Sequence, residues 1–371
     1  MLTPKYFPSL TIRLSEAEAL RRLAEPIKDS LFPIIRVQAW PHPKKGEGGP
    51  VERSTDHVVG AYGARPIGID LAPPLPPSDK PYKTKDRADW AELGRSEVAA
   101  LHNPANGYQA WCTFIGSDER RIPVVQWTDD AQMLKSQVQQ LAALNRGLIF
   151  RFRRSQGWNL AQAAALADLS LGQNHILMVY DYEQIGLRDD LTSIGVTTQS
   201  AILTSNIRIS GGSRTHVFKA SSFPSEFTST GEEYACLTIR ERQLYEMLKA
   251  SPPIVAAGIE LNYGDHAAIY ASERLPAFRG VPRVDYPTPG EWIYHRRREG
   301  FHDAASRVRA DAKWDDGNLC WGAQRIREAA NGQMEGLGAP GKWTTIRMNI
   351  HMHVQAQFGD AALSTDEPWM D

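Results

Sequence analysis

Eight short runs rich in β-branched and aromatic residues recur along the first 263 residues of the chain. Such runs are typical of buried strands, and helix-forming stretches follow several of them. The predicted strands are Tyr6–Leu14, Phe32–Gln38, Arg65–Leu71, Ile122–Trp127, Leu148–Arg153, Ile176–Tyr182, His216–Ser222 and Ala257–Tyr263. Strands that alternate with helices indicate parallel βα units, and eight strands within about 260 residues match a closed (β/α)8 barrel. We therefore predict an α/β fold with a TIM-like barrel.

The segments between these runs carry the predicted helices. They are Ser15–Asp29, Ala88–Leu101, Asp129–Asn145, Leu160–Leu171 and Arg240–Lys249. Ser15 and Glu18 have the spacing of a capping box, and Leu191–Ile207, rich in Thr and Ser, is predicted as a short helix plus a loop. An open doubly wound sheet is the alternative architecture, but no glycine-rich phosphate-binding sequence follows the first strand.

Beyond Tyr270 the pattern changes to aromatic and Arg-rich segments. We predict a barrel at residues 1–275 and a C-terminal extension, residues 276–371, that packs on it. Two histidines there, His351 and His353, fall on a predicted strand, where they would share one face and could bind a metal. No third ligand is evident, so a structural role is favoured and no metal site is assigned.

The charge balance limits the classes of partner. Lys and Arg number 42 and Asp and Glu 43 among 371 residues, a formal charge of −1. A nucleic-acid partner is disfavoured, because duplex binding needs a strongly basic face, and the basic segment 294–298 is interpreted as a solvated surface. Three scattered cysteines and the lack of a long apolar run or leader pattern predict a cytoplasmic protein without a membrane anchor.

Alternation within each predicted strand identifies candidate site residues, since successive side chains of a barrel strand point inward and outward in turn. In the fifth strand, for example, Phe150 and Phe152 would point outward, with Arg151 and Arg153 inward. Binding and catalytic residues of barrel enzymes lie at the carboxyl ends of the strands. The polar residues predicted there are Arg36, Asp70, Gln126, Arg151, Arg153, Asp181, Lys219 and Glu260.

These residue types favour a small anionic or phosphorylated, nucleotide-like ligand, because arginine holds phosphate and carboxylate groups with two parallel hydrogen bonds. The predicted ligand-binding residues are Arg36, Gln126, Arg151, Arg153 and, in the loop after the eighth strand, Asp265. The predicted catalytic residues are Asp70, Asp181, Glu260 and Lys219. The carboxylates would act as general acid and base in phosphoester hydrolysis, or hold Mg²⁺. The alternative, given equal weight, is that these charged residues only form buried ion pairs with one another and bind no ligand.

Several segments together resemble the beta protein family of bacteria and phages. They are YFPSLTIRLSEAEALRRL, LFPIIRVQ, HVFKASSFP, TIRERQLYEML, LNYGDHAAIY, RVDYPTPGEWIYHRR, CWGAQRIREAANG and GKWTTIRMNIHMHV. The resemblance implies a phage or prophage setting and a role in phage–host conflict, and it supplies no catalytic residues. The family's ending has adjacent histidines, which His351 and His353 are not.

Two functions follow from these observations. The first is an enzyme or binding protein that takes an anion at the barrel mouth. The second is a non-catalytic component of phage defence or counter-defence, which would bind a protein partner through aromatic residues of the extension, the side chains favoured at binding hot spots. These are Trp292, Tyr294, Trp314, Trp321 and Trp343.

Overall fold

One sheet contains all eight predicted strands, and every neighbouring pair in it is parallel. The computed structural model describes residues 4–11, 13–40, 48–74, 82–172, 174–209, 212–224, 233–271 and 281–359. The strands are β1 (Tyr6–Thr11), β2 (Ile34–Val37), β3 (Ile67–Leu71), β4 (Arg121–Pro123), β5 (Leu148–Arg153), β6 (Ile176–Gln184), β7 (Arg214–Ser221) and β9 (Leu261–Asp265).

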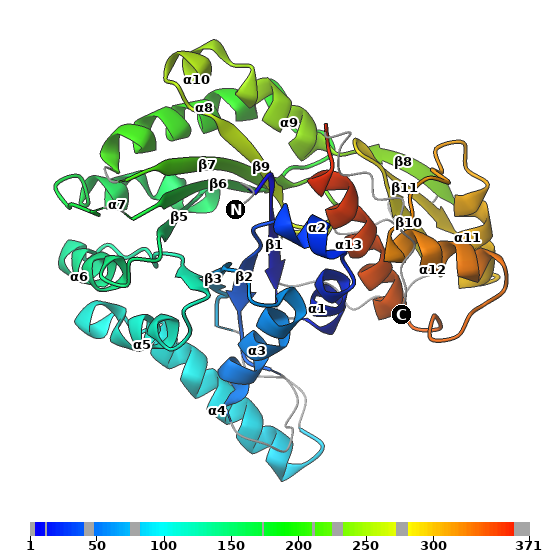
Figure 1. Cartoon of the computed structure of the whole chain (residues 1–371), viewed down its shortest axis with the longest axis horizontal. Helices are drawn as coiled ribbons and strands as arrows, with labels where there is room; N and C mark the ends of the chain where they lie inside the picture. Colours follow the sequence, from blue (N-terminus) through cyan, green and yellow to red (C-terminus); the bar gives the residue numbers. More distant parts are fainter. Residues whose placement is uncertain are drawn as a thin grey trace.

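The sheet curls until its two outer strands meet. Its order is β4-β3-β2-β1-β9-β7-β6-β5. Just after β4, Val124 forms a parallel bridge with Ile149 of β5, and the Val125 amide donates to the Ile149 carbonyl at 2.9 Å. The result is a nearly closed, barrel-like parallel sheet with helices around it (Figure 1).

Helices from the connections cover the outer face of this sheet. They are α1 (Leu14–Arg21), α2 (Glu25–Asp29), α3 (Pro50–Tyr62), α4 (Lys85–Leu101), α5 (Ala105–Gly116), α6 (Ala131–Ala142), the 3-10 turn η1 (Arg154–Asn159), α7 (Leu160–Ala164), α8 (Leu191–Arg208), α9 (Arg240–Lys249) and α10 (Pro252–Ala256). Helix α6 shows why these segments are helical: the Asp130 carboxylate caps it by accepting the Gln132 and Met133 amides, and Leu134, Val138 and Leu141 are buried on one face.

Three helix predictions need correction. The predicted Ser15 capping box is wrong: Arg13 is the N-cap of α1, and Pro26, in the first turn of α2, begins a separate helix. The helix predicted over Leu160–Leu171 ends at Ala164. Conversely, the segment predicted as a short helix plus a loop belongs to one 18-residue helix, α8, in which the Ser205 hydroxyl donates to the Ala201 carbonyl.

A second, smaller sheet lies in the C-terminal part. It is antiparallel, in the order β10-β11-β8, and β8 comes from the segment between β7 and α9. Its elements are β8 (Tyr234–Thr238), β10 (Arg283–Pro287), β11 (Glu291–Arg296), α11 (Phe301–Arg309), α12 (Trp321–Ala330) and α13 (Pro340–Ala356). The predicted boundary after residue 275 lies outside the described residues.

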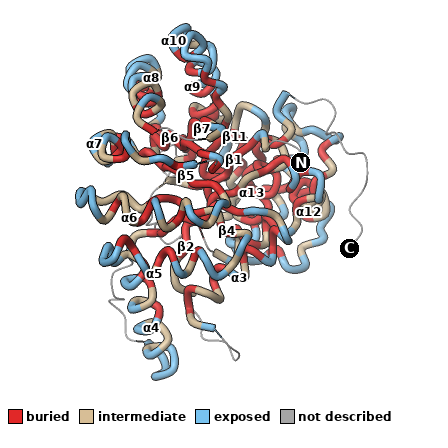
Figure 2. The backbone as a smooth tube through the Cα atoms, turned by 60° about the vertical axis from the view of Figure 1, so that its left-hand side comes forward, coloured by how far each residue is buried: buried red, intermediate tan, exposed pale blue. Residues whose placement is uncertain are grey.

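Helix α13 lies between the barrel and the smaller sheet (Figure 1). Met348 and Met352 join the barrel's hydrophobic core, whereas Ile346 and Ile350 join a separate core around Val284 and Ile293. The strand predicted around His351 and His353 is therefore wrong. Most of this helix is buried (Figure 2), so its sequence lacks the one-sided apolar pattern of a surface helix.

Candidate functional site

The barrel interior has an apolar layer and a polar layer. The apolar cluster includes Phe7, Ile34, Val124, Ile149, Leu177, Val179 and Val217. Two positions further along the chain, and so on the same side of the sheet, polar residues replace them. These residues are Arg36, Gln126, Arg151, Asp181 and Lys219. The predicted polar mouth thus lies at the carboxyl end of the strands.

Arg151 links the two carboxylates of this mouth. Its Nη1 lies 2.6 Å from Asp70 Oδ2, and its Nε lies 2.8 Å from Asp181 Oδ2. Asp70 also receives Gln126 Nε2 at 3.2 Å and Arg153 Nη2 at 3.3 Å. Burial would raise the pKa of Asp70, but Arg151 and Arg153 outweigh it and lower this pKa to about 2. Both partners of the central pairs therefore stay charged at neutral pH.

Asp181 also holds Lys219 and His266. Lys219 Nζ lies 2.9 Å from Asp181 Oδ2, and His266 Nε2 lies 3.3 Å from Asp181 Oδ1. Burial, with the charge of Arg151, lowers the pKa of Lys219 to about 7. Burial also lowers the pKa of His266 to about 4, so this imidazole is neutral at neutral pH.

Further charged groups lie around the mouth. Arg36 is buried, and burial together with Arg151 and Arg153 lowers its pKa to about 10. Glu16 of α1 is buried near Arg36, with Thr11 donating to it through its hydroxyl at 2.6 Å and through its amide. The cluster thus contains the bases Arg36, Arg151, Arg153 and Lys219 and the acids Glu16, Asp70 and Asp181, with Glu183 at its edge.

A cavity of about 200 Å³ opens beside this cluster, over the ends of β3, β4 and β5. Its polar and aromatic lining includes Asp70, Gln126, Arg151, Arg153, Tyr108 and Trp127. Lys219 and Asp181 are fully buried behind it. A ligand in this cavity would meet the guanidinium groups first.

Backbone strain also gathers at the mouth. Glu183, two residues after Asp181, has a φ of 71°. Ala267 and Ala268, which come after β9, have φ values of 50° and 58°. Side-chain-bearing residues rarely adopt this left-handed conformation. Such strain is concentrated at functional sites and persists only where surrounding contacts enforce it.

Two predicted residues lie elsewhere. Glu260 is exposed and immediately precedes β9, so the prediction that it lies late in its strand is wrong: the strand begins later than expected. Asp265 is buried but contacts His351 of α13 rather than the mouth cluster. The structure therefore brings together the other seven residues of the predicted set, with the ion pairs anticipated for buried charges.

Sequence reasoning missed His266 and Glu16. The inward alternation of β9, continued through Gly264, reaches His266, so the same rule that found Lys219 could have found it. Glu16 had no such signal, because it belongs to a helix and reaches the mouth only through the turn after β1.

The carboxylates do not fit a Mg²⁺ site. Asp70 and Asp181 face Arg151, which occupies the position between them where a cation would bind. Among the residues that the structure describes, no group of three or more His, Cys, Asp or Glu side chains could hold a metal ion. Within that same part of the chain, no helix is long and apolar enough to cross a membrane.

The aromatic residues of the extension are mostly internal. Trp292 and Tyr294 are buried with Phe223 and Ala268, and Trp343 is buried in the core around Ile346. Trp314 and Trp321 are half-buried. Three of the five residues predicted for partner recognition therefore serve packing, and Arg297 of the basic segment pairs with Glu233 and Asp303.

The fold and the mouth define an α/β protein with a nearly closed parallel barrel and a charged site at the carboxyl end of its strands. The sequence model of the family described as Beta protein matches residues 6–357, so the chain belongs to the Beta protein family, as its motifs predicted. It is 27% identical to Protein beta of Enterobacteria phage P4 over 368 residues, which cover 96% of this chain and 94% of that protein. No solved structure matches it.

Proposed function

We propose that the chain is a (β/α)8 barrel protein that binds a compact phosphate- or carboxylate-bearing ligand at its mouth. The strand order and the Val124–Ile149 bridge support the barrel type. The cavity lining has two guanidinium groups, of Arg151 and Arg153, against one carboxylate, of Asp70, and this local excess of positive charge supports the ligand's charge. A buried cation is costly unless an opposite charge accompanies it, and a bound anion would supply that charge.

Arg153 is the best-placed anchor for this ligand. Its side chain is 17% exposed, whereas that of Arg151 is 4% exposed, and both line the cavity. Arg153 meets Asp70 through one nitrogen at 3.3 Å, which leaves other donors of its planar group for an anion. Gln126 adds an uncharged donor on the same side of the cavity.

The cavity volume favours a small ligand. Ligand pockets usually measure about 300–1,000 Å³, and about 200 Å³ is below that range. The cavity would therefore take a phosphate group or a small phosphate ester rather than an entire nucleotide.

Binding is better supported than hydrolysis. Lys219 and Asp181 lie behind the lining, one contact away from the cavity, so in this arrangement they would adjust its charge rather than attack a ligand. An anion would also favour the protonated form of Lys219, so binding of sulfate, whose own charge is constant in this range, should strengthen as pH falls from about 8 to 6. Phosphoester hydrolysis and a cytoplasmic role in phage–host conflict remain predictions, the latter supported by the phage P4 relative.

Titration with inorganic phosphate, sulfate and glycerol phosphate tests this proposal. Isothermal calorimetry should detect binding to the wild type and its loss in Arg153→Gln. Arg154→Gln is a matched control, because Arg154 is the next residue, is exposed and stacks on Tyr182 outside the cavity. The absence of binding by all three anions at millimolar concentration, or equal effects of the two substitutions, would refute the proposal.

A further inference from the structure

Asp265 connects the last barrel strand to the C-terminal helix. The carboxylate is buried on the outer side of β9, where His351 Nε2 lies 2.7 Å and Tyr263 Oη 3.1 Å from its Oδ2. Its Oδ1 accepts the Tyr6 hydroxyl and, at 2.7 Å, the Ala267 amide. All four donors are protein groups, so this carboxylate has its hydrogen-bonding capacity filled by the fold.

The next residue faces the opposite side of the sheet. His266 points into the barrel, with its Nε2 3.3 Å from Asp181 Oδ1. Consecutive residues thus connect α13 outside the barrel to the ion pairs inside it. The path runs through His351, Asp265, His266 and Asp181, each within hydrogen-bonding distance of, or adjacent in sequence to, the one before.

The loop that carries His266 is held in an unfavourable conformation. Ala267 and Ala268 are both left-handed, although alanine rarely adopts this region. The Asp265 carboxylate fixes the turn through the Ala267 amide, and Ala268 packs with Trp292 and Tyr294 of β11. The C-terminal part of the chain therefore holds this loop from two elements, α13 and β11.

We propose that Asp265 and His351 are positioning residues through which α13 holds His266 against Asp181 and so sets the anion affinity of the mouth. The affinity part of this inference rests on the proposed function. The position of His266 does not depend on it and can be measured separately.

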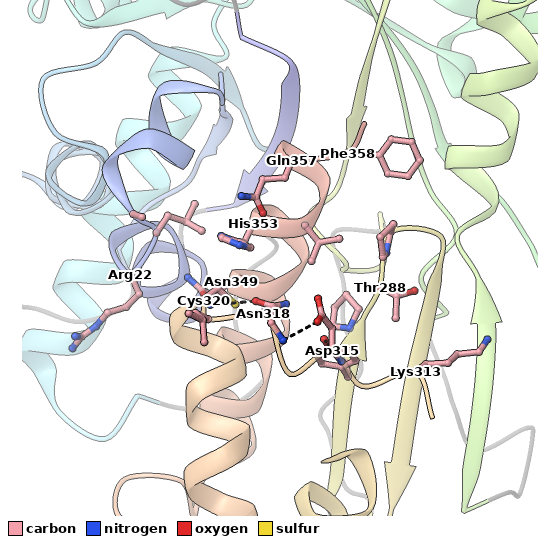
Figure 3. A pocket seen from close by; sticks show the side chains of 18 of the residues that line it. Arg22, Thr288, Lys313, Asp315, Asn318, Cys320, Asn349, His353, Gln357 and Phe358 are labelled. Atoms are coloured by element: carbon pink, nitrogen blue, oxygen red, sulfur yellow. Dashed lines mark hydrogen bonds between the residues drawn. The ribbon is translucent and has the colours of Figure 1, made fainter. Parts of the chain in front are cut away.

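His353 supplies the matched control. It is two residues further along α13, and within the described residues its imidazole makes no hydrogen bond. It lines a cavity of about 400 Å³ between the barrel and the smaller sheet (Figure 3). His351→Leu and His353→Leu make the same chemical change on the same helix, but only the first removes a bond to Asp265.

Two readouts are needed. Imidazole ¹⁵N resonances of His266, assigned by His266→Gln, report its position without any ligand, and calorimetry with inorganic phosphate reports affinity. We expect His351→Leu to move the His266 resonances and weaken phosphate binding at least about fivefold, the lower end of coupling between linked sites. His353→Leu should change neither, and His351→Gln, which retains a donor near Asp265, should restore the wild-type spectrum.

The outcomes separate the two proposals. If phosphate does not bind the wild type but the resonances move only in His351→Leu, the positioning role stands and the proposed function fails. If phosphate binds and the two leucine variants behave alike, the positioning role is overturned and the proposed function stands. If His351→Leu does not fold, Asp265→Asn replaces it in the test. This variant should also move the His266 resonances, and unmoved resonances would overturn the inference.

Discussion

Replacement of Arg151 by methionine should destabilise the protein in a pH-dependent way. Arg151 is buried between Asp70 and Asp181 and donates to both. Removing one partner of a buried ion pair costs about 3–5 kcal/mol, because the remaining charge stays in a poorly hydrated site. We expect this loss in Arg151→Met at pH 7.

The size of the pH effect follows from Asp70. The pKa of this carboxyl in the folded protein is about 2, against an ordinary value of 3.8. A lowered carboxyl pKa stabilises the fold above its unfolded-state value, and this stabilisation is lost as pH falls through the folded-state pKa. The shift corresponds to about 2 kcal/mol at 1.36 kcal/mol per pH unit. Arg151→Met should forfeit this part at pH 7, and its deficit should shrink by roughly 2 kcal/mol as pH falls from about 4 to 2, between the unfolded- and folded-state pKa values of Asp70.

Urea unfolding of both proteins at pH 7 and pH 2 measures this difference. The double variant Asp70→Asn with Arg151→Met is the control: it removes a carboxylate together with its partner and should recover part of the stability at pH 7. A deficit below about 1 kcal/mol, or one that is equal at both pH values, would contradict the account of the mouth as a cluster of mutually dependent charges.

Three further predictions concern positions that differ in burial. The folded-state pKa of Lys219 is about 7, below its usual value, so Lys219 releases its proton on folding and the wild type should become up to a few kcal/mol more stable between pH 7 and 10. Lys219→Met should remove this increase, and urea unfolding midpoints measure it. Gly68→Ala should lower the free energy of unfolding by about 1–3 kcal/mol through overpacking, because the new Cβ would lie 2.9 Å from Ile149 Cδ1 and 3.1 Å from Ile34 Cγ1. An unchanged melting temperature would contradict this packing. Glu260→Gln, at an exposed position before β9, should change stability by less than about 0.5 kcal/mol and leave phosphate affinity as in the wild type; weaker binding would place Glu260 at the mouth after all.

Much of the barrel could be predicted because its strands are short, buried runs with a strict inward–outward alternation. The same alternation placed Arg36, Asp70, Arg151, Asp181 and Lys219 in one cluster, since parallel strands bring equivalent positions to one end. It failed for Glu260 because the rule needs the strand's starting point, and β9 begins at Leu261.

The structure of the C-terminal part was harder to predict from its sequence. Helix α13 packs against two hydrophobic cores, so apolar residues occur around its circumference and the helical period is weak. The partners of His351 and Glu16 are contacts between distant elements, and no local pattern encodes them. Asp265 illustrates the limit: it was predicted in the loop after the strand, at the mouth, but it is the last residue of β9 and contacts His351 on the outer side of the sheet.

The pairing of β8 with β11 has a consequence for the order in which the chain can assemble. Strand β8 is synthesised between β7 and β9, yet its hydrogen-bonding partner is more than fifty residues further along the chain. Until that partner emerges from the ribosome, β8 presents an open edge, the kind of surface that recruits other strands. Removal of the residues beyond Tyr270 would make this condition permanent. We therefore expect a truncated barrel to aggregate where the full chain does not, because the barrel sheet is complete at β9 while β8 still lacks its partner, which comes later in the chain.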